Sequence, residues 1–422
     1  MKMIPRTAIP VGNREIAVLI EALLSGNALR GQQVEEFERE FAHYLGVGRA
    51  YAFNSGRTAL SVALQALELE REAEVLVPAY TCAIVFEVVL RLGLRVVAVD
   101  VDPETYNINP DLISKSITPN ARAIVPIHLF GQPCQMDKII QIAEKYGLNV
   151  IEDVAQALGA TYKQRKVGTF GDMSIFSFGP GKSITSGQGG ALVINNPQLE
   201  DKVAQLQVQL KMPDSDWNLT LIRNVLAMKM FSKQHLYKTI RGRLEESLLK
   251  DDEAIVENCM RLIHQGKSAA VNPTVKMAKM PAFSAEIAKT QLKRIDSLNE
   301  KRRTNAAELS ALLAGSEHFI SLPRTYDGLE HTFTRYTTRV LKGPRETLMA
   351  RLLKRGIDTE RPYFYLPKVL RAMKAESPVA IALSQSALTL PNHPLIKSSD
   401  IVKIATAVTS ELKFNPRGKS NN

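Results

Sequence analysis

Apolar residues follow two periods along the first half of the chain, and the change between them predicts the order of the elements. In residues 14–26 and 32–46 apolar side chains recur every three or four positions, which predicts two helices that Gly26 and Gly46 can end. Beyond them, continuous apolar runs alternate with helical patterns, which predicts an α/β fold with a mostly parallel sheet covered by helices on both faces. The runs predict strands at 49–53, 73–78, 95–101, 122–129 and 149–154, separated by helices at 56–69, 82–93, 110–117 and 136–147.

A different pattern begins after about residue 200. Residues 205–270 combine helical spacing with many basic side chains, which predicts a helical insertion. Residues 284–315 predict one long connecting helix, and the short strand and helix patterns that follow it are typical of a smaller α+β domain. We therefore expect a large domain in residues 1–283, including the N-terminal helices and the insertion, and a connector helix with a small domain in residues 284–422.

Composition adds limits to this picture. The chain has 422 residues, more than one hydrophobic core usually holds, which agrees with two domains. Its net charge of +11 permits phosphorylated ligands, nucleic acid or an anionic membrane as partners and does not choose among them. Three widely separated cysteines argue against a disulfide framework or a metal site of the zinc type. Because the first residues also lack the apolar core of a signal peptide, we expect a cytoplasmic protein.

The stretch GPGKSITSGQGG, residues 179–190, raises the first question of chemistry. Its Gly-Lys-Ser resembles the end of a phosphate-binding P-loop, but a P-loop needs glycine where Phe176 stands and a helix after the serine. The residues that follow have the pattern of a strand instead. Lys182 is therefore a lysine in a tight loop between two strands. It is either a solvated charge or an amine that forms a Schiff base with an aldehyde cofactor.

Two polar residues at another strand end can serve the ring of such a cofactor. Asp153 ends an apolar strand, and the carboxyl ends of parallel strands are where ligands collect. Its carboxylate can pair with a protonated pyridine nitrogen, which keeps the ring an electron sink, or it can simply cap a helix. Gln156, three residues on, is placed to reach a ring hydroxyl.

A candidate phosphate site lies at the start of a predicted helix. Ser55, Gly56 and Arg57 follow a strand directly, so their free N–H groups and the helix dipole favour an anion. The same residues are also how a plain capped helix begins. Ser177, five residues before Lys182, offers a further hydroxyl for the same phosphate.

Together these stretches resemble a known family. In order and spacing they are similar to the pyridoxal-phosphate-dependent sugar aminotransferases of the DegT/StrS type, over most of the chain except about residues 205–275. The resemblance implies fold type I, with a seven-stranded type of sheet, and usually a homodimer whose active site lies near the subunit interface. The stretches that carry it include SGRTAL (55–60), VLVPAYT (75–81), NVIEDVAQALGATY (149–162), GTFGDMSIFSF (168–178) and SGQGGAL (186–192).

Matched position by position, the resemblance implies roles for the candidate residues. Lys182 matches the Schiff-base lysine, Asp153 the partner of the pyridinium nitrogen, and Gln156 the residue beside the ring hydroxyl. Ser177 and the Gly56–Arg57 turn match phosphate contacts. Relatives that dehydrate deoxysugars have histidine in place of this lysine, so Lys182 favours transamination.

The chain also departs from the family pattern. Cys82 stands where an aromatic residue usually contacts the cofactor ring, and Tyr80 is the nearest aromatic candidate for that contact. Gln188 replaces a common glutamate, and Arg57 a common threonine. A Gly-x-Asn-x-Arg segment that reaches across the dimer to the phosphate in relatives is missing. We hypothesise that Arg57 supplies this charge from within the subunit.

The expected function is transfer of an amino group from a donor such as glutamate to a keto group of a nucleotide-linked sugar. The same chemistry on a lipid-linked or secondary-metabolite carbonyl, or a non-catalytic regulatory protein, are the alternatives. We expect a homodimer and no nucleic-acid partner. The insertion is either a helical cover or dimerisation element, or a segment, through residues 218–244, that lies on a membrane surface or lines the site for a large substrate. His128, after a predicted strand, is interpreted as a packed histidine rather than a metal ligand or proton relay.

Overall fold

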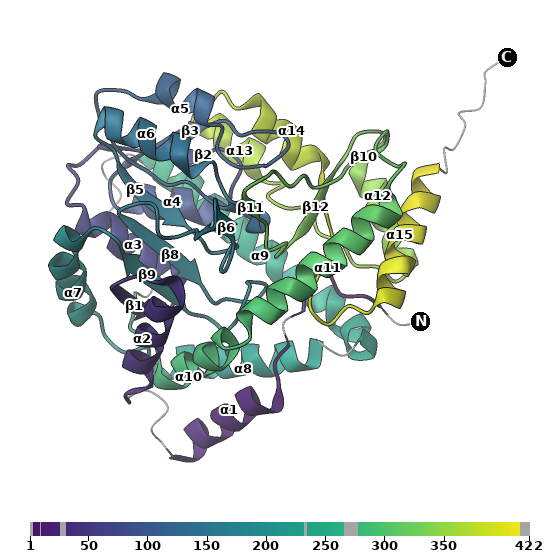
Figure 1. Cartoon of the computed structure of the whole chain (residues 1–422), viewed down its shortest axis with the longest axis horizontal. Helices are drawn as coiled ribbons and strands as arrows, with labels where there is room; N and C mark the ends of the chain where they lie inside the picture. The colour runs from purple at the N-terminus through teal and green to yellow at the C-terminus, as the bar shows by residue number, and fades with distance from the viewer. Residues whose placement is uncertain (1–2, 9, 26–30, 232–233, 266–276, 414–422) are drawn as a thin grey trace.

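The computed structural model describes residues 3–8, 10–25, 31–231, 234–265 and 277–413. A seven-stranded sheet forms the centre of the larger part of the molecule (Figure 1). Its strand pairs are parallel except where β9 meets β8 and β1, so β9 alone runs against the others. The mostly parallel sheet is confirmed. Its strands, in spatial order, are β1 (Arg49–Phe53), β9 (Gly190–Ile194), β8 (Met173–Ser177), β5 (Asn149–Asp153), β4 (Ala121–Ile124), β2 (Glu74–Pro78) and β3 (Arg95–Val99).

Helices cover both faces of this sheet, as its continuous apolar strands require. Each face has its own buried apolar cluster. One cluster holds side chains of α3 (Gly56–Ala66), α4 (Ala83–Arg91) and α7 (Glu200–Gln209). The other holds side chains of α2 (Gln33–Leu45), α5 (Pro110–Ser116) and α6 (Met136–Tyr146). Gly46 ends α2 in the left-handed conformation at φ 75°, the role predicted for it, whereas Gly26 lies outside the described residues.

The long connecting helix predicted for residues 284–315 is wrong in one respect, because the segment forms two helices. α10 (Ala282–Leu292) and α11 (Ile295–Leu313) are separated at Arg294, whose φ of −117° and ψ of 1° leave the helical region. The two helices pack on different partners. α10 lies against α2 and α1 (Asn13–Ser25), whereas α11 lies against α15 (Ser398–Lys413). The break lets each helix follow its own core.

A second, smaller core lies beyond α11. It is built on a three-stranded antiparallel sheet of β10 (Ile320–Ser321), β12 (Tyr336–Val340) and β13 (Ala387–Leu390), with α12 (Arg345–Lys354) and α15 packed on it. Ile4 belongs to this core and bridges to Ile357, while α13 (Leu366–Ala372) and α14 (Pro378–Ser386) pack on the large sheet's core. The domain division between residues 283 and 284 stays a prediction. Ile4 comes before this division but packs in the smaller core, and α13 and α14 come after it but pack on the larger one. The remaining elements are β6 (Thr161–Tyr162), β7 (Arg165–Lys166) and β11 (Leu329–Glu330), which form a third small sheet, and the short helices η1 (Leu129–Gly131) and η2 (Pro197–Leu199).

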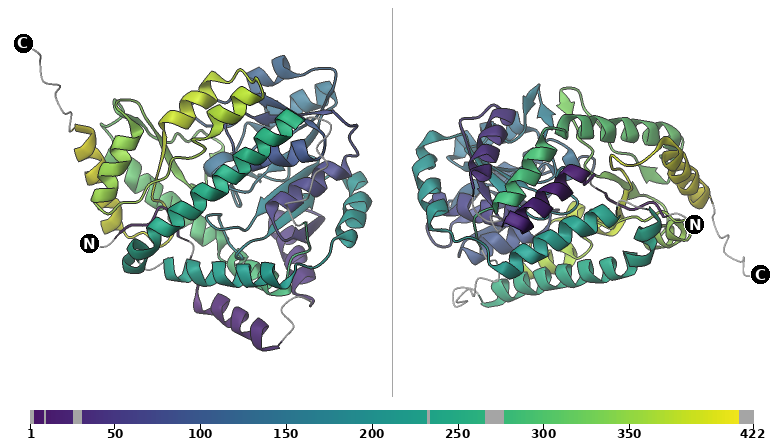
Figure 2. Two further views of the ribbon diagram at one scale, coloured as in Figure 1. Left: turned by 180° about the vertical axis from the view of Figure 1, so that it is seen from behind. Right: turned by 90° about the horizontal axis from the view of Figure 1, so that it is seen from below.

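The predicted insertion is helical. It contains α8 (Ser215–Phe231) and α9 (Gln234–Gln265), and Figure 2 shows α9 as a long helix across the back of the molecule. Near its start, Tyr237 and Arg241 bond to the buried carboxylate of Asp358 at 2.5 and 2.8 Å. Near its end, the Cys259 thiol contacts the Ala83 carbonyl at the start of α4. α9 therefore ties the smaller core to the wall of the larger one.

Three apolar side chains are exposed on one face of α8. Leu219, Leu226 and Met230 fall on one line of the helix and are 67%, 44% and 49% exposed; we call them the α8 stripe. The opposite face, with Leu221 and Val225, is buried against α1 and α10. No helix among the described residues is long and apolar enough to cross a membrane.

Candidate active site

A pocket of about 310 Å³ opens at the carboxyl ends of β5 and β8. Parallel α/β sheets bind their ligands at this edge, because loops and helix N-termini converge there. Six of the eight predicted site residues line it: Ser55, Gly56, Arg57, Asp153, Ser177 and Lys182. These residues come from three separate segments of the chain, and the fold alone brings them together.

Lys182 lies in the loop between β8 and β9. Its N–H donates to the Gly179 carbonyl at 3.3 Å, and Gly181 takes the left-handed conformation at φ 77°, which closes a tight turn. Burial lowers the pKa of the Lys182 amine, and the nearby Asp153 carboxyl offsets part of that shift. A lowered pKa increases the fraction of neutral amine, which is the form that attacks an aldehyde.

Asp153 is the last residue of β5 and is 6% exposed. One of its carboxylate oxygens accepts the Ala155 N–H at 2.9 Å, inside a turn, so it does not cap a helix. Burial raises the pKa of its carboxyl, while Ala155, Lys182 and His128 act in the opposite direction. Two titratable groups whose pKa values are displaced in one pocket mark a candidate reactive site.

The neighbouring residue Glu152 holds the floor of this site. Its fully buried carboxylate accepts the N–H groups of Gly168, Phe170 and Gly171 at 2.6 to 2.9 Å. Nδ1 of His128 accepts the Cys134 N–H, so its Nε2 carries the proton and donates to Glu152 at 3.1 Å. His128 is thus a packed, fully bonded histidine, as interpreted from the sequence.

The predicted phosphate site is the start of α3. Ser55 is the N-cap, with its Oγ accepting the Thr58 N–H at 3.1 Å, so the capped-helix interpretation holds for Ser55 itself. The N–H groups of Gly56 and Arg57 make no hydrogen bond to another described residue and remain available to an anion. A Cβ on Gly56 would lie 2.9 Å from the Cβ of Ser177, so only glycine lets the two segments approach this closely.

The Arg57 side chain is partly exposed and lines the same pocket. No ion pair or hydrogen bond joins its guanidinium to another residue in the described part of the chain. A cation that is not neutralised beside free backbone N–H groups favours a phosphate ligand.

Tyr80 and Gln156 do not line the pocket. Tyr80 is fully buried, its hydroxyl donates to the Pro362 carbonyl at 3.1 Å, and its ring packs against Tyr363. Gln156 accepts the Phe130 N–H at 3.2 Å and donates to the Tyr363 hydroxyl at 2.8 Å. Both residues stand in an aromatic layer behind the pocket, held by the loop that carries Tyr363.

Three further residues line the pocket although the sequence did not assign them a role. Cys82 and Gln188, which replace the family's usual residues, both line the pocket. Trp217, from the first turn of α8, lines it too. It is the chain's only tryptophan, and this was the one available signal, because no sequence pattern links the insertion to the Lys182 loop.

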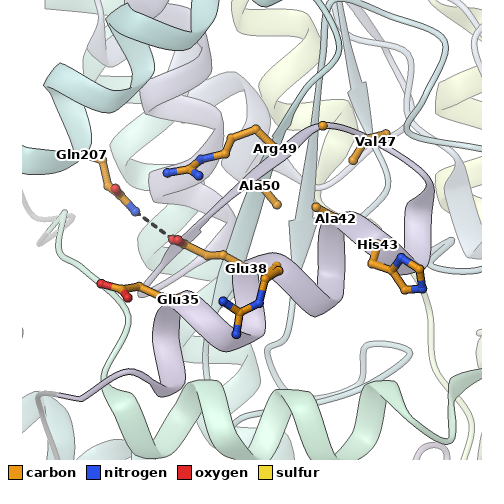
Figure 3. Close-up of a pocket in the computed structure, with 10 residues that line it drawn as sticks. Glu35, Glu38, Ala42, His43, Val47, Arg49, Ala50 and Gln207 are labelled. Carbon is orange, nitrogen blue, oxygen red and sulfur yellow. Dashed lines mark hydrogen bonds between the residues drawn. The ribbon is translucent and has the colours of Figure 1, made fainter.

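A larger hollow lies elsewhere and contains none of the predicted site residues. It measures about 610 Å³ and runs between α2 and β1, the edge strand of the sheet (Figure 3). There Glu38 accepts the Ala52 N–H at 2.7 Å and the Gln207 amide at 3.0 Å. Glu38 therefore satisfies an N–H at the open edge of β1, which is a structural task.

Comparison with known proteins completes this picture. The model of the DegT/DnrJ/EryC1/StrS aminotransferase family matches residues 11–227 and 247–409. The chain belongs to this family. The family resemblance inferred from the motifs and the expectation of an aminotransferase are confirmed. The unmatched residues 228–246 fall within the insertion, at the end of α8 and the start of α9.

Individual relatives are similar in sequence to this chain along nearly its whole length. The dTDP-3-amino-3,4,6-trideoxy-alpha-D-glucose transaminase of Streptomyces venezuelae is 30% identical, covering 93% of this chain and 90% of that protein. The UDP-N-acetyl-3-dehydro-alpha-D-glucosamine 3-aminotransferase of Acidithiobacillus ferrooxidans is also 30% identical, over 97% of this chain and all of that protein. The crystal structure of S. venezuelae DesV is 26% identical, with a TM-score of 0.75 over 98% of this chain and 100% of that one.

Aminotransferases of this family use pyridoxal phosphate, and the pocket fits that group. It presents an amine of lowered pKa, a buried carboxylate and a helix N-terminus with free N–H groups. These are a nucleophile for an aldehyde, an acceptor for a protonated pyridine nitrogen and donors for a phosphate.

Proposed function

We propose that this aminotransferase moves an amino group from an amino acid such as glutamate to a keto group of a nucleotide-linked sugar, with the pocket at Lys182 as its active site. The observation that carries the proposal is the convergence of Lys182, Asp153 and the start of α3 on one pocket. Nucleotide-sugar relatives at 30% identity over almost the full chain support the choice of acceptor. A homodimer and a cytoplasmic location belong to the same proposal.

The chain's own residues divide the work. The cofactor, when bound, supplies an aldehyde carbon and an electron-withdrawing ring. The Lys182 amine would hold that carbon, and as a free amine it would accept and return a proton at the substrate carbon. Asp153 would keep the pyridine nitrogen protonated, and its buried position would strengthen that pairing. Gly56, Arg57 and Ser177 would hold the phosphate.

In this proposal Tyr80 and Gln156 support the cofactor site from the aromatic layer around Tyr363. The hydrogen bond from Gln156 to the Tyr363 hydroxyl and the packing of Tyr80 on Tyr363 fix one aromatic layer. Gln156 reaches a ring hydroxyl if its Nε2 exchanges Tyr363 for the cofactor. Tyr80 supports the ring through this layer, in place of the direct contact expected from the sequence.

Absorption spectroscopy tests the reaction. The purified holoenzyme is expected to show the visible band of a lysine-bound cofactor, and glutamate is expected to bleach it. Lys182→Ala should lack the band, whereas Lys138→Ala, an exposed lysine on α6, should retain it. A wild-type protein without the band, or with a band that no amino acid changes, would favour the regulatory alternative.

The acceptor is tested separately. The aminated form of the enzyme is offered nucleotide-linked 3-keto and 4-keto sugars and, in parallel, ketones without a nucleotide. Recovery of the band with a nucleotide-linked ketosugar supports the proposal. Recovery with other carbonyls alone would move the assignment to the lipid-linked or secondary-metabolite class.

Arg57 has its own test, because pyridoxal lacks the phosphate it is proposed to hold. A charged hydrogen bond contributes about 1.5–3 kcal/mol, so Arg57→Gln should weaken pyridoxal phosphate binding roughly 10- to 150-fold. Binding of pyridoxal should stay unchanged. Equal losses for both ligands would show that Arg57 acts on the pocket's shape and not on the phosphate.

A further inference from the structure

We propose that Trp217 is the surface on which the acceptor's nucleobase stacks, and that it makes the enzyme select nucleotide-linked acceptors. The inference rests on the proposed function and gives the insertion a part in it. Trp217 lines the pocket that holds Lys182, yet it belongs to α8 and not to the sheet that positions the other lining residues.

The position of Trp217 is fixed by its helix. Trp217, Leu221 and Val225 are spaced by four residues, so they share one face of α8. That face lies directly on the loop after Lys182: a Cβ on Gly187 would lie 2.8 Å from the Leu221 carbonyl and 3.0 Å from Val225. The contact pins α8 to the loop, and Trp217 stands one turn before it, where the buried face reaches the pocket.

The start of α8 is held as well. The Asp214 carboxylate accepts the Trp217 N–H at 2.9 Å, and the Asn218 amide donates to the Asp214 carbonyl at 2.8 Å. A first turn capped in this way keeps its residues in place before any ligand arrives. Preorganised aromatic surfaces lose little conformational entropy on binding.

The indole presents carbon and not its N–H to the pocket. Its Nε1 is shielded from solvent and has no hydrogen-bond partner among the described residues, although the side chain as a whole is partly exposed. What remains accessible is therefore ring surface. Leu60, Ile84 and Val85 line the same pocket and extend its apolar wall. A flat, apolar wall fits a flat ring, and every nucleobase has a π-face that stacks on an aromatic side chain.

The size of the pocket places the base outside the cofactor site. Binding pockets for small molecules span about 300–1,000 Å³, and this one, at about 310 Å³, is at the lower limit. A cofactor and a complete nucleotide-linked sugar do not fit together in that space. The nucleotide must extend beyond the cofactor's part of the pocket, and the partly exposed Trp217 is a lining residue that can meet it there.

Because Trp217 is the only tryptophan, its emission reports on this one place. Titrating the wild-type holoenzyme with UDP, dTDP and GDP is expected to change that emission saturably for at least one of them. Inorganic pyrophosphate, which carries no base, is expected to leave it unchanged. No change with any of the three nucleotides, or an equal change with pyrophosphate, would overturn the assignment.

Kinetics of variants give the second readout. Trp217→Ala should lower kcat/KM for a nucleotide-linked ketosugar about five- to 150-fold, mainly through KM, because base–aromatic stacking contributes about 1–3 kcal/mol. Trp217→Phe keeps a ring and should recover most of the loss. Leu219→Ala, on the exposed face of the same helix, is the matched control and should match the wild type.

The donor half-reaction separates stacking from general damage. If Trp217→Ala lowers kcat/KM for glutamate and for the ketosugar by the same factor, Trp217 serves the cofactor or the packing of α8, and the proposal fails. If glutamate does not convert the wild-type holoenzyme at all, the proposed function fails. Nucleotide-dependent emission in that same sample would still report on stacking, so the two failures are distinguishable.

Discussion

The buried carboxylate of Glu152 offers the sharpest test of how the floor of the site is built. Its two oxygens face four donors: Phe170 and Gly171 N–H on one oxygen, and Gly168 N–H and the His128 imidazole on the other. Glu152→Gln keeps the shape and replaces one oxygen with an NH₂ group. Whichever way the amide turns, its NH₂ meets two donors, so two buried N–H groups lose their acceptor.

The magnitude follows from that count. A buried donor without an acceptor costs about 1–3 kcal/mol, so the substitution should lower the free energy of unfolding by about 2–6 kcal/mol. His128 does not relieve the conflict by changing tautomer, because its Nδ1 already accepts the Cys134 N–H at 3.0 Å. Cofactor binding should weaken too, because the backbone N–H of His128 donates to the backbone carbonyl of Asp153 at 3.0 Å. A disturbed floor would therefore displace Asp153.

Urea unfolding followed by circular dichroism measures the first effect, on the cofactor-free wild type and variant. The matched control is Glu144→Gln, an exposed carboxylate on α6, which should change stability by no more than about 0.5 kcal/mol. A loss below about 1 kcal/mol for Glu152→Gln would refute the hydrogen-bond accounting. It would mean that the loop at residues 168–171 rearranges at little cost.

Four further outcomes are expected. Gly56→Ala puts a methyl group 2.9 Å from the Cβ of Ser177 and should weaken pyridoxal phosphate binding at least about fivefold. Gly48→Ala, with open space around it, should leave that binding unchanged. Equal affinities of the Gly56→Ala variant and the wild type would contradict the close approach. Burial lowers the pKa of His331 from 6.5 to about 3, so as the pH falls this side chain is protonated in the unfolded chain before it is protonated in the folded one. Stability from this group is therefore complete above pH 6.5 and falls by about 1.4 kcal/mol per pH unit below it. His331→Gln should remove that slope in urea midpoints at pH 7 and pH 5, and an unchanged slope would count against it. Capture of pyridoxal phosphate by the cofactor-free protein should speed up with pH around a midpoint below the 10.5 of an ordinary lysine, because burial lowers the pKa of Lys182; a midpoint at 10.5 or above would exclude this. If the insertion lies on a membrane surface, serine at all three positions of the α8 stripe should abolish co-sedimentation with anionic liposomes at low salt, and equal pelleting would end that hypothesis.

The local pattern of apolar residues was enough to predict much of the fold. The strands β1, β2, β3 and β5 and the helices between them fall where apolar periodicity predicts, because a strand buried on both faces must be continuously apolar. The helix predicted across residues 293 and 294 shows the limit. No glycine or proline interrupts that stretch, and the break arises because α10 and α11 pack on different cores.

For the site, the sequence by itself predicted the candidates: a lysine, a carboxylate and a helix start that could hold an anion. Residue type near the strand ends singles out these residues, and the family resemblance implies their roles. Tertiary structure decided distances and neighbours. It moved Tyr80 and Gln156 behind the pocket, because the Tyr363 loop packs on them, and it brought Trp217 in, because α8 lies on Gly187. Contacts between segments far apart in sequence leave no periodic trace, so only the folded chain shows them.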